Sequence, residues 1–211
     1  MTIKLINEDC MNYMATLPDK AFDLAIVDPP YGVFDPDKKI NRTGGSWSKK
    51  YQRDNNIKNW DFAPSDGYFI ELRRVSVNQV IWGGNYFNLP PCRCFLIWEK
   101  LTISEAFTMA MVEYAWTSFN SNAKLFKHSP QRNGDGIHPT QKPVKLYEWI
   151  LTNYAKPGQR ILDTHLGSGS SAIAAHYYGV DFVGCELDTD YFNAAKARFH
   201  RQTAQVDMFQ K

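Results

Sequence analysis

The most constraining feature of the sequence is an apolar strand that two prolines bring to an end. The run 22–27 is followed at once by Asp28, Pro29, Pro30 and Tyr31. Proline has no amide hydrogen for a sheet and drives the preceding residue towards an extended backbone, so the strand must end near Asp28 in a stiff turn. The Asp28 carboxylate and the Pro29 carbonyl then form a fixed pair of acceptors beside an aromatic face.

This corner suits a flat group that carries an NH2. A nucleobase amine is a poor nucleophile because its lone pair is delocalised into the ring. Two acceptors that hold its N–H bonds favour a pyramidal nitrogen, and the carboxylate can later take a proton. A base stacked on an aromatic side chain gains about 1–3 kcal/mol. The alternative interpretation is a Pro-Pro turn after a strand, with a surface tyrosine.

A unit of strand, glycine turn and helix follows later in the chain. Residues 159–163 have the pattern of a strand and residues 170–178 that of a helix. The next predicted strand, 181–185, ends at Glu186, where a carboxylate can bind ribose hydroxyls. A Gly-x-Gly turn followed by an acidic residue also fits an NAD site, but the dinucleotide fingerprint needs a glycine at Ala172.

A third segment, His-Pro-Thr-Gln-Lys-Pro at 138–143, opens another predicted helix. Pro143 suits a first helical turn. Backbone amides and the Thr140 hydroxyl can meet a carboxylate at such a helix start, and Lys142 can serve that carboxylate or a DNA phosphate. A capped helix without a ligand is the alternative.

Together the three segments resemble the amino-group DNA methyltransferases of the permuted beta group, in which the catalytic motif precedes the cofactor motif. Residues 28–31 match the catalytic tetrapeptide. Residues 162–171 are similar to the S-adenosylmethionine loop, with Thr164 and His165 where relatives usually have Pro-Phe. The resemblance covers nearly the whole chain. It implies a doubly wound, mostly parallel α/β sheet of the class I S-adenosylmethionine-dependent methyltransferase type, circularly permuted.

The resemblance also implies methyl transfer from S-adenosylmethionine to the N6 amine of an adenine extruded from double-stranded DNA, as in restriction–modification systems. The residues implied to be catalytic are Asp28, Pro29, Pro30 and Tyr31. Those implied to bind the cofactor are Asp9, Cys10, Thr140, Gln141, Lys142, Asp163, His165, Gly167, Gly169, Ser170 and Glu186. Asp9 is equally well suited to cap a helix, and we expect His165 to be a tolerated ring substitution.

Three other functions remain open. Adenine is favoured over cytosine only by the resemblance, because the cytosine-N4 enzymes more often carry serine at the position of Asp28. The second alternative is a DNA-binding homologue that has lost turnover, for which His165 is the only hint. The third is an NAD-linked oxidoreductase.

Basic residues are concentrated between Phe34 and Trp60, a stretch that contains seven Lys and Arg residues and three Asp residues. The stretch lacks apolar periodicity and is predicted to be a mobile loop over the active site. The residues expected to meet DNA phosphates are Lys38, Lys39, Arg42, Lys49, Lys50 and Arg53, with Lys127 and Arg132 in a second basic stretch. A solvated surface loop is the alternative. Residues 102–136 leave the only room for a short target-recognition segment.

Length and composition agree with one domain spanning residues 1–211. A chain of 211 residues with 44% apolar content can bury one large core. No apolar run is long enough to span a membrane, so a cytoplasmic protein is expected. The four cysteines have no metal-binding spacing, so we expect reduced thiols and no metal. A homodimer is an expectation from the resemblance alone.

Overall fold

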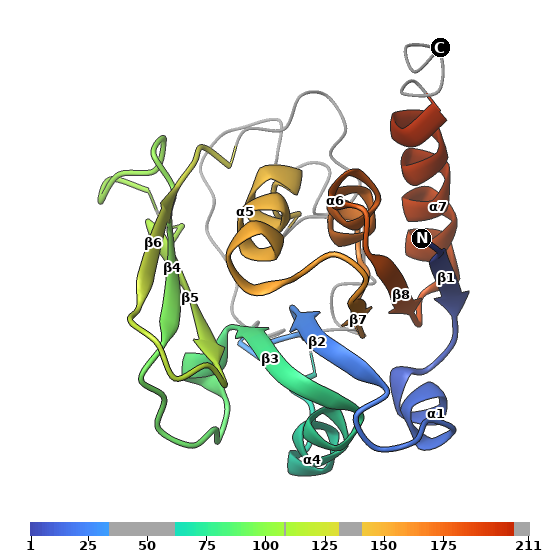
Figure 1. The fold of residues 1–211 in the computed structure, drawn as a ribbon. Helices are drawn as coiled ribbons and strands as arrows, with labels where there is room; N and C mark the ends of the chain where they lie inside the picture. The colour runs from blue at the N-terminus through green and yellow to red at the C-terminus, as the bar shows by residue number, and fades with distance from the viewer. Residues whose placement is uncertain (34–61, 108, 131–140, 205–211) are drawn as a thin grey trace.

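The computed structural model describes residues 1–33, 62–107, 109–130 and 141–204 (Figure 1). The elements, in chain order, are β1 (Ile3–Asn7), α1 (Cys10–Ala15), β2 (Phe22–Val27), α4 (Asp66–Val75), β3 (Ser76–Trp82), the 3-10 turn η1 (Gly84–Tyr86), β4 (Phe95–Glu99), β5 (Val112–Thr117), β6 (Lys124–Lys127), α5 (Val144–Tyr154), β7 (Arg160–Asp163), α6 (Ser170–Tyr178), β8 (Asp181–Glu186) and α7 (Thr189–Ala204).

The described strands form one sheet in the order β1-β8-β7-β2-β3-β5-β4-β6. Only β5 runs antiparallel to its neighbours β3 and β4, and the remaining pairs are parallel. The predicted mostly parallel sheet is confirmed. The first strand, β1, lies beside the last, β8, with Ile3 opposite Phe182. Circular permutation stays a prediction.

Helices cover both faces of this sheet. Figure 1 shows α5 and α6 on one face and α1 and α4 on the other. Successive side chains of a strand point to opposite faces. Leu24 and Ile26 of β2 therefore pack in the core that contains α5 and α6, while Ala25 and Val27 pack in the core that contains α1 and α4. A strand buried on both faces explains why 22–27 is an apolar run, and the doubly wound architecture is confirmed.

Most elements expected from the sequence occur where the pattern placed them. The predicted strands in 22–27, 159–163 and 181–185 are present, and Gly179 ends α6 in the left-handed region, at φ 85°. No helix among the described residues has the length and apolar character that crossing a bilayer requires.

The segment 102–136 contributes two strands to the sheet, β5 and β6. Its role in target recognition stays a prediction. Residues 131–136 and the basic stretch 34–60 lie outside the described part of the chain.

Candidate active site

The candidate site lies where parallel strands end. β1, β2, β7 and β8 run in the same direction, so their carboxyl ends meet at one edge of the sheet. This is the edge at which open α/β sheets bind ligands. A cavity of about 640 Å³ opens there. It brings together the residues that follow β2 and the loop that follows β7, which are more than a hundred residues apart in the sequence.

Most of the site residues predicted from the sequence line this one cavity. They are Asp9, Cys10, Asp28, Pro29, Pro30, Tyr31, Gln141, Lys142, His165, Gly167, Ser170 and Glu186. Asp163, the last residue of β7, and Gly169, the residue that precedes α6, do not line it. Thr140 falls outside the described residues.

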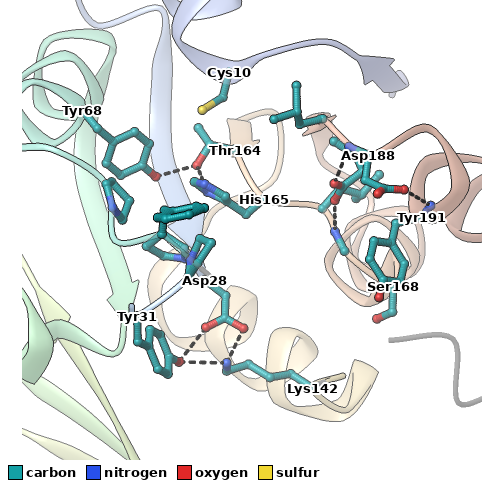
Figure 2. Close-up of a pocket in the computed structure, with 18 of the residues that line it drawn as sticks. Cys10, Asp28, Tyr31, Tyr68, Lys142, Thr164, His165, Ser168, Asp188 and Tyr191 are labelled. Atoms are coloured by element: carbon teal, nitrogen blue, oxygen red, sulfur yellow. Dashed lines mark hydrogen bonds and ion pairs between the residues drawn. The ribbon is translucent and has the colours of Figure 1, made fainter. Parts of the chain in front are cut away.

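Asp28 is the centre of a polar cluster at one end of the cavity (Figure 2). The Tyr31 hydroxyl donates a hydrogen bond of 2.7 Å to Asp28 Oδ1, and Lys142 Nζ donates one to Asp28 Oδ2. Lys142 Nζ also lies 3.1 Å from Oε2 of Glu113, which belongs to β5. The Lys142 side chain is 3% exposed and that of Asp28 17%, so this ammonium is buried between two carboxylates.

The protonation of this cluster follows from its burial. Burial raises the pKa of Asp28 and Glu113 raises it further, whereas the adjacent Lys142 ammonium lowers it; the net pKa is above the ordinary value. Burial alone would lower the pKa of Lys142, but Asp28 and Glu113 hold it above the ordinary value. Lys142 is therefore a permanent cation, and Asp28 is a carboxylate with an enhanced affinity for protons.

Tyr31 is positioned by a glycine. Its ring stacks on Tyr86 with centroids 5.0 Å apart and an interplanar angle of 20°. Gly83 lies directly against the same ring, and a Cβ atom built there would be 2.1 Å from Tyr31 Cε1. Gly83 also has a left-handed backbone, with φ 69°. The strand end at β3 thus needs glycine both for its backbone angle and for the space that Tyr31 occupies.

The other end of the cavity is built on the loop between β7 and α6. The Gly167 amide donates to Glu186 Oε2 at 2.8 Å, and the Asp188 amide donates to Glu186 Oε1 at 3.1 Å. Asp163 accepts from the His165 amide at 3.0 Å and from the Ser171 hydroxyl at 2.5 Å, beneath the loop. Asp163 therefore supports the loop from below, and burial raises its pKa to about 7.

The two departures from the usual motif, Thr164 and His165, contact each other, and both contact Tyr68. Thr164 Oγ1 lies 2.6 Å from the Tyr68 hydroxyl and 2.9 Å from His165 Nδ1. The rings of Tyr68 and His165 pack edge to face, with centroids 5.4 Å apart. Burial lowers the pKa of His165 to about 4, so the imidazole is neutral at physiological pH. His165 thus forms an uncharged wall of the cavity, held in place by Thr164 and Tyr68.

The structure confirms one of the two roles expected for Asp9, that of a helix cap. Its side chain caps α1 by accepting the Met11 amide at 2.7 Å, and it also faces the cavity. Lys127 lies on β6 and pairs with Glu99 at 2.9 Å, away from the cavity lining. The other residues expected to bind DNA, Lys38, Lys39, Arg42, Lys49, Lys50, Arg53 and Arg132, lie outside the described residues.

Glu113 and Tyr68 are among the cavity-lining residues that sequence reasoning missed. Tyr68 belongs to α4, whose buried residues Tyr68, Phe69, Leu72 and Val75 have helical spacing, so a signal for it was present. Glu113 lies near the start of β5. Its place at the active edge depends on β5 running antiparallel, which no local pattern reveals.

The fold is that of solved DNA methyltransferases. The structure superposes on M1.HpyAVI in complex with SAM with a TM-score of 0.60 at 20% identity, over 93% of this chain and 98% of that one. It matches the cytosine-N4-specific PvuII DNA methyltransferase with a TM-score of 0.61 at 14% identity, over 97% and 91% of the two chains. TTHA0409 of Thermus thermophilus, complexed with S-adenosyl-L-methionine, gives 0.58 at 19% identity, over 96% of each chain.

The sequence identifies the family. The family model for DNA methylases of the N6/N4 type matches residues 46–197, so the chain belongs to this DNA methylase family. It is 26% identical over 208 residues to YubD of Escherichia coli (strain K12), covering 92% of this chain and 89% of that protein. It is 22% identical to the type II methyltransferase M.HinfI of Haemophilus influenzae, covering 92% of this chain and 67% of that protein.

Proposed function

We propose that this DNA methylase transfers a methyl group from S-adenosylmethionine to the N6 amine of adenine in double-stranded DNA. The observation that carries the proposal is the single cavity that contains both the Asp28 corner and the loop before α6. The target amine and the methyl donor would then be bound in the same cavity, so that they could react without first having to diffuse together.

The lining of the cavity fits S-adenosylmethionine. Glu186 at the end of β8 is suited to ribose hydroxyls, and the apolar side chains of Met11, Leu166 and Leu187 are suited to the flat adenine. Asp9, Cys10, Gln141, His165, Gly167 and Ser170 would complete this end. The bound cofactor would supply an electrophilic methyl group on sulfur.

The Asp28 end would hold the base. The target adenine must leave the DNA stack to enter the cavity, as enzymes acting on bases require. The Pro29 carbonyl and the Asp28 carboxylate would accept the two N–H bonds of its amine, and Tyr31 would offer an aromatic surface. Asp28 would take up the proton that the amine loses, for which its raised pKa is favourable.

Cytosine N4 is the second candidate. PvuII DNA methyltransferase, which shares the fold, is cytosine-N4-specific. Both bases carry an exocyclic amine that the same two acceptors could hold. Adenine is preferred because aspartate at position 28 resembles the N6-adenine enzymes, whereas the cytosine-N4 enzymes more often carry serine there.

Identification of the methylated nucleoside tests the proposal. Unmethylated genomic DNA is incubated with the protein and S-adenosylmethionine labelled in the methyl group, then digested to nucleosides and separated by mass. We expect the label in N6-methyladenine. Label in N4-methylcytosine would support the second candidate, and DNA binding without any label would indicate a homologue that has lost turnover.

A further inference from the structure

Lys142 and Glu113 are charged residues of the cavity to which the proposed function gives no role. Glu113 is the second residue of β5, which begins at the active edge because it runs antiparallel to β3. Its Oε1 lies 2.7 Å from Lys100 Nζ and its Oε2 lies 3.1 Å from Lys142 Nζ. Asp28, Lys142, Glu113 and Lys100 thus form a row of alternating charges.

The two ammonium groups of the row are buried. The side chains of Lys142 and Lys100 are 3% and 7% exposed, and that of Glu113 is 24% exposed. A buried ammonium that loses its counterion is strongly destabilised, because the low dielectric gives no other compensation for its charge. Lys142 would meet this situation whenever Asp28 gains a proton, unless a second carboxylate remains beside it.

Glu113 has the capacity to be that second carboxylate. Its Oε2 is buried and accepts no hydrogen bond from any described residue, although the Lys142 ammonium is 3.1 Å away. Lys142 instead donates to Asp28 Oδ2 and to the Tyr31 hydroxyl. The ammonium has three N–H donors, and a small rotation would direct one of them at Glu113 Oε2 without moving either strand.

We infer, resting on the proposed function, that Glu113 is a positioning residue. It becomes the counterion of the Lys142 ammonium as Asp28 accepts the proton of the target amine. In this step the amine nitrogen donates its lone pair to the methyl carbon, and the carbon–sulfur bond breaks with its electrons left on sulfur. The proton leaves the nitrogen for Asp28, and its bonding electrons stay on the nitrogen. Lys142 remains an ammonium throughout.

The inference predicts a definite change in pH dependence. Asp28 faces Tyr31 from the turn after β2, Lys142 from the segment before α5, Tyr147 from α5, Glu113 from β5 and Asp163 from β7. Of these, Lys142 is the only cation, and it lowers the pKa of Asp28, while Glu113 raises it. In Glu113→Gln the negative charge of Glu113 is lost while the Lys142 ammonium stays beside Asp28, so the pKa of Asp28 falls.

The first test is the single-turnover rate of DNA methylation between pH 5 and 9. In Glu113→Gln we expect the acidic limb to move about one unit to lower pH and the plateau rate to fall about tenfold, because Asp28 becomes a weaker base. Glu113→Asp keeps the carboxylate and should recover most of the rate. Glu99→Gln removes a solvent-facing ion pair on the adjacent strand and serves as the control, with an unchanged profile.

The second test does not need turnover. The side-chain carboxyl of Asp28 is titrated by carbon-13 NMR in the protein without DNA, with Asp28→Asn to assign the signal. We expect its midpoint to fall in Glu113→Gln and to stay in Glu99→Gln. An unchanged midpoint together with an unchanged rate profile would overturn the inference. A wild-type protein that methylates no DNA would refute the proposed function, while the titration would still decide the role of Glu113.

Discussion

Tyr31 owes its position to the absence of a side chain at Gly83. The ring fills the space where a Cβ atom would be 2.1 Å from Cε1, so any larger residue must push the ring away from Asp28. If Tyr31 presents its ring to the base, Gly83 contributes to catalysis without touching the substrate.

We therefore expect Gly83→Ala to reduce methyl transfer by at least tenfold. Gly158→Ala is the matched control, because Gly158 also has a positive φ, 81°, but no described atom lies within 4 Å of the position that an added Cβ would take. Backbone strain should lower the free energy of unfolding of each variant by about 1 kcal/mol, measured by urea denaturation, and displacement of the Tyr31 ring adds to this loss in Gly83→Ala alone. Equal activities in the two variants would show that the contact between Gly83 and Tyr31 is unimportant.

The junction between β7 and α6 is held by a buried carboxylate. Asp163 is 1% exposed and fastens both sides of the turn through the His165 amide and the Ser171 hydroxyl. Behind the same turn, the Arg198 guanidinium of α7 donates to the Ser168 carbonyl at 2.9 Å. Two helices and a strand thus fix the loop before any cofactor binds.

The raised pKa of Asp163 makes the stability of this junction depend on pH. The folded pKa is about 7, against about 3.9 in an unfolded chain. Between these values the folded state binds more protons, so the stability that Asp163 contributes is present below pH 4 and is lost as pH rises through 7.

Asp163→Asn removes the titrating group but keeps an acceptor for the His165 amide. From pH 4 to 7 we expect the unfolding free energy of the wild type to fall relative to this variant by about 2–4 kcal/mol. Asp190→Asn, at an exposed position in α7, is the control. The difference in unfolding free energy between the wild type and this control should not change with pH. Parallel stability curves for wild type and Asp163→Asn would contradict the account.

DNA binding is a property of the whole molecule. The cavity can receive a base only if the duplex lies over the carboxyl edge of the sheet. The formal net charge of +2 is too small to bind DNA by itself, so we predict that the Lys and Arg concentrated in 34–60 provide the phosphate contacts.

Combined replacement of Lys38, Lys39 and Arg42 by glutamine should weaken DNA binding and reduce its dependence on salt. Each lost phosphate contact lowers the slope of log affinity against log salt by about 0.9, so a decrease of about 2–3 is expected from fluorescence anisotropy. Lys156→Gln is the control, since Lys156 is exposed just before β7, at the opposite edge of the sheet. An unchanged slope in the triple variant would remove 34–60 from the DNA interface.

The sequence predicted those parts of the molecule whose causes are local. β2 ends at Val27, directly before Asp28 and the two prolines, and Glu186 ends β8 beside the glycine turn that precedes α6. It did not predict the partners of Lys142, because the direction of β5 and the meeting of β2, β5 and the segment before α5 arise only from the assembled sheet. Glu113 was missed for the same reason.

The role of Asp28 is tested most directly by Asp28→Ala. The initial rate of labelled methyl transfer to DNA is compared with that of the wild type, alongside the dissociation constant for S-adenosylmethionine as a check that the site is intact. We predict a loss of at least a thousandfold in rate with cofactor affinity within about threefold, because the variant lacks both an amine acceptor and the proton acceptor. A variant that binds cofactor and methylates DNA as fast as the wild type would contradict the account.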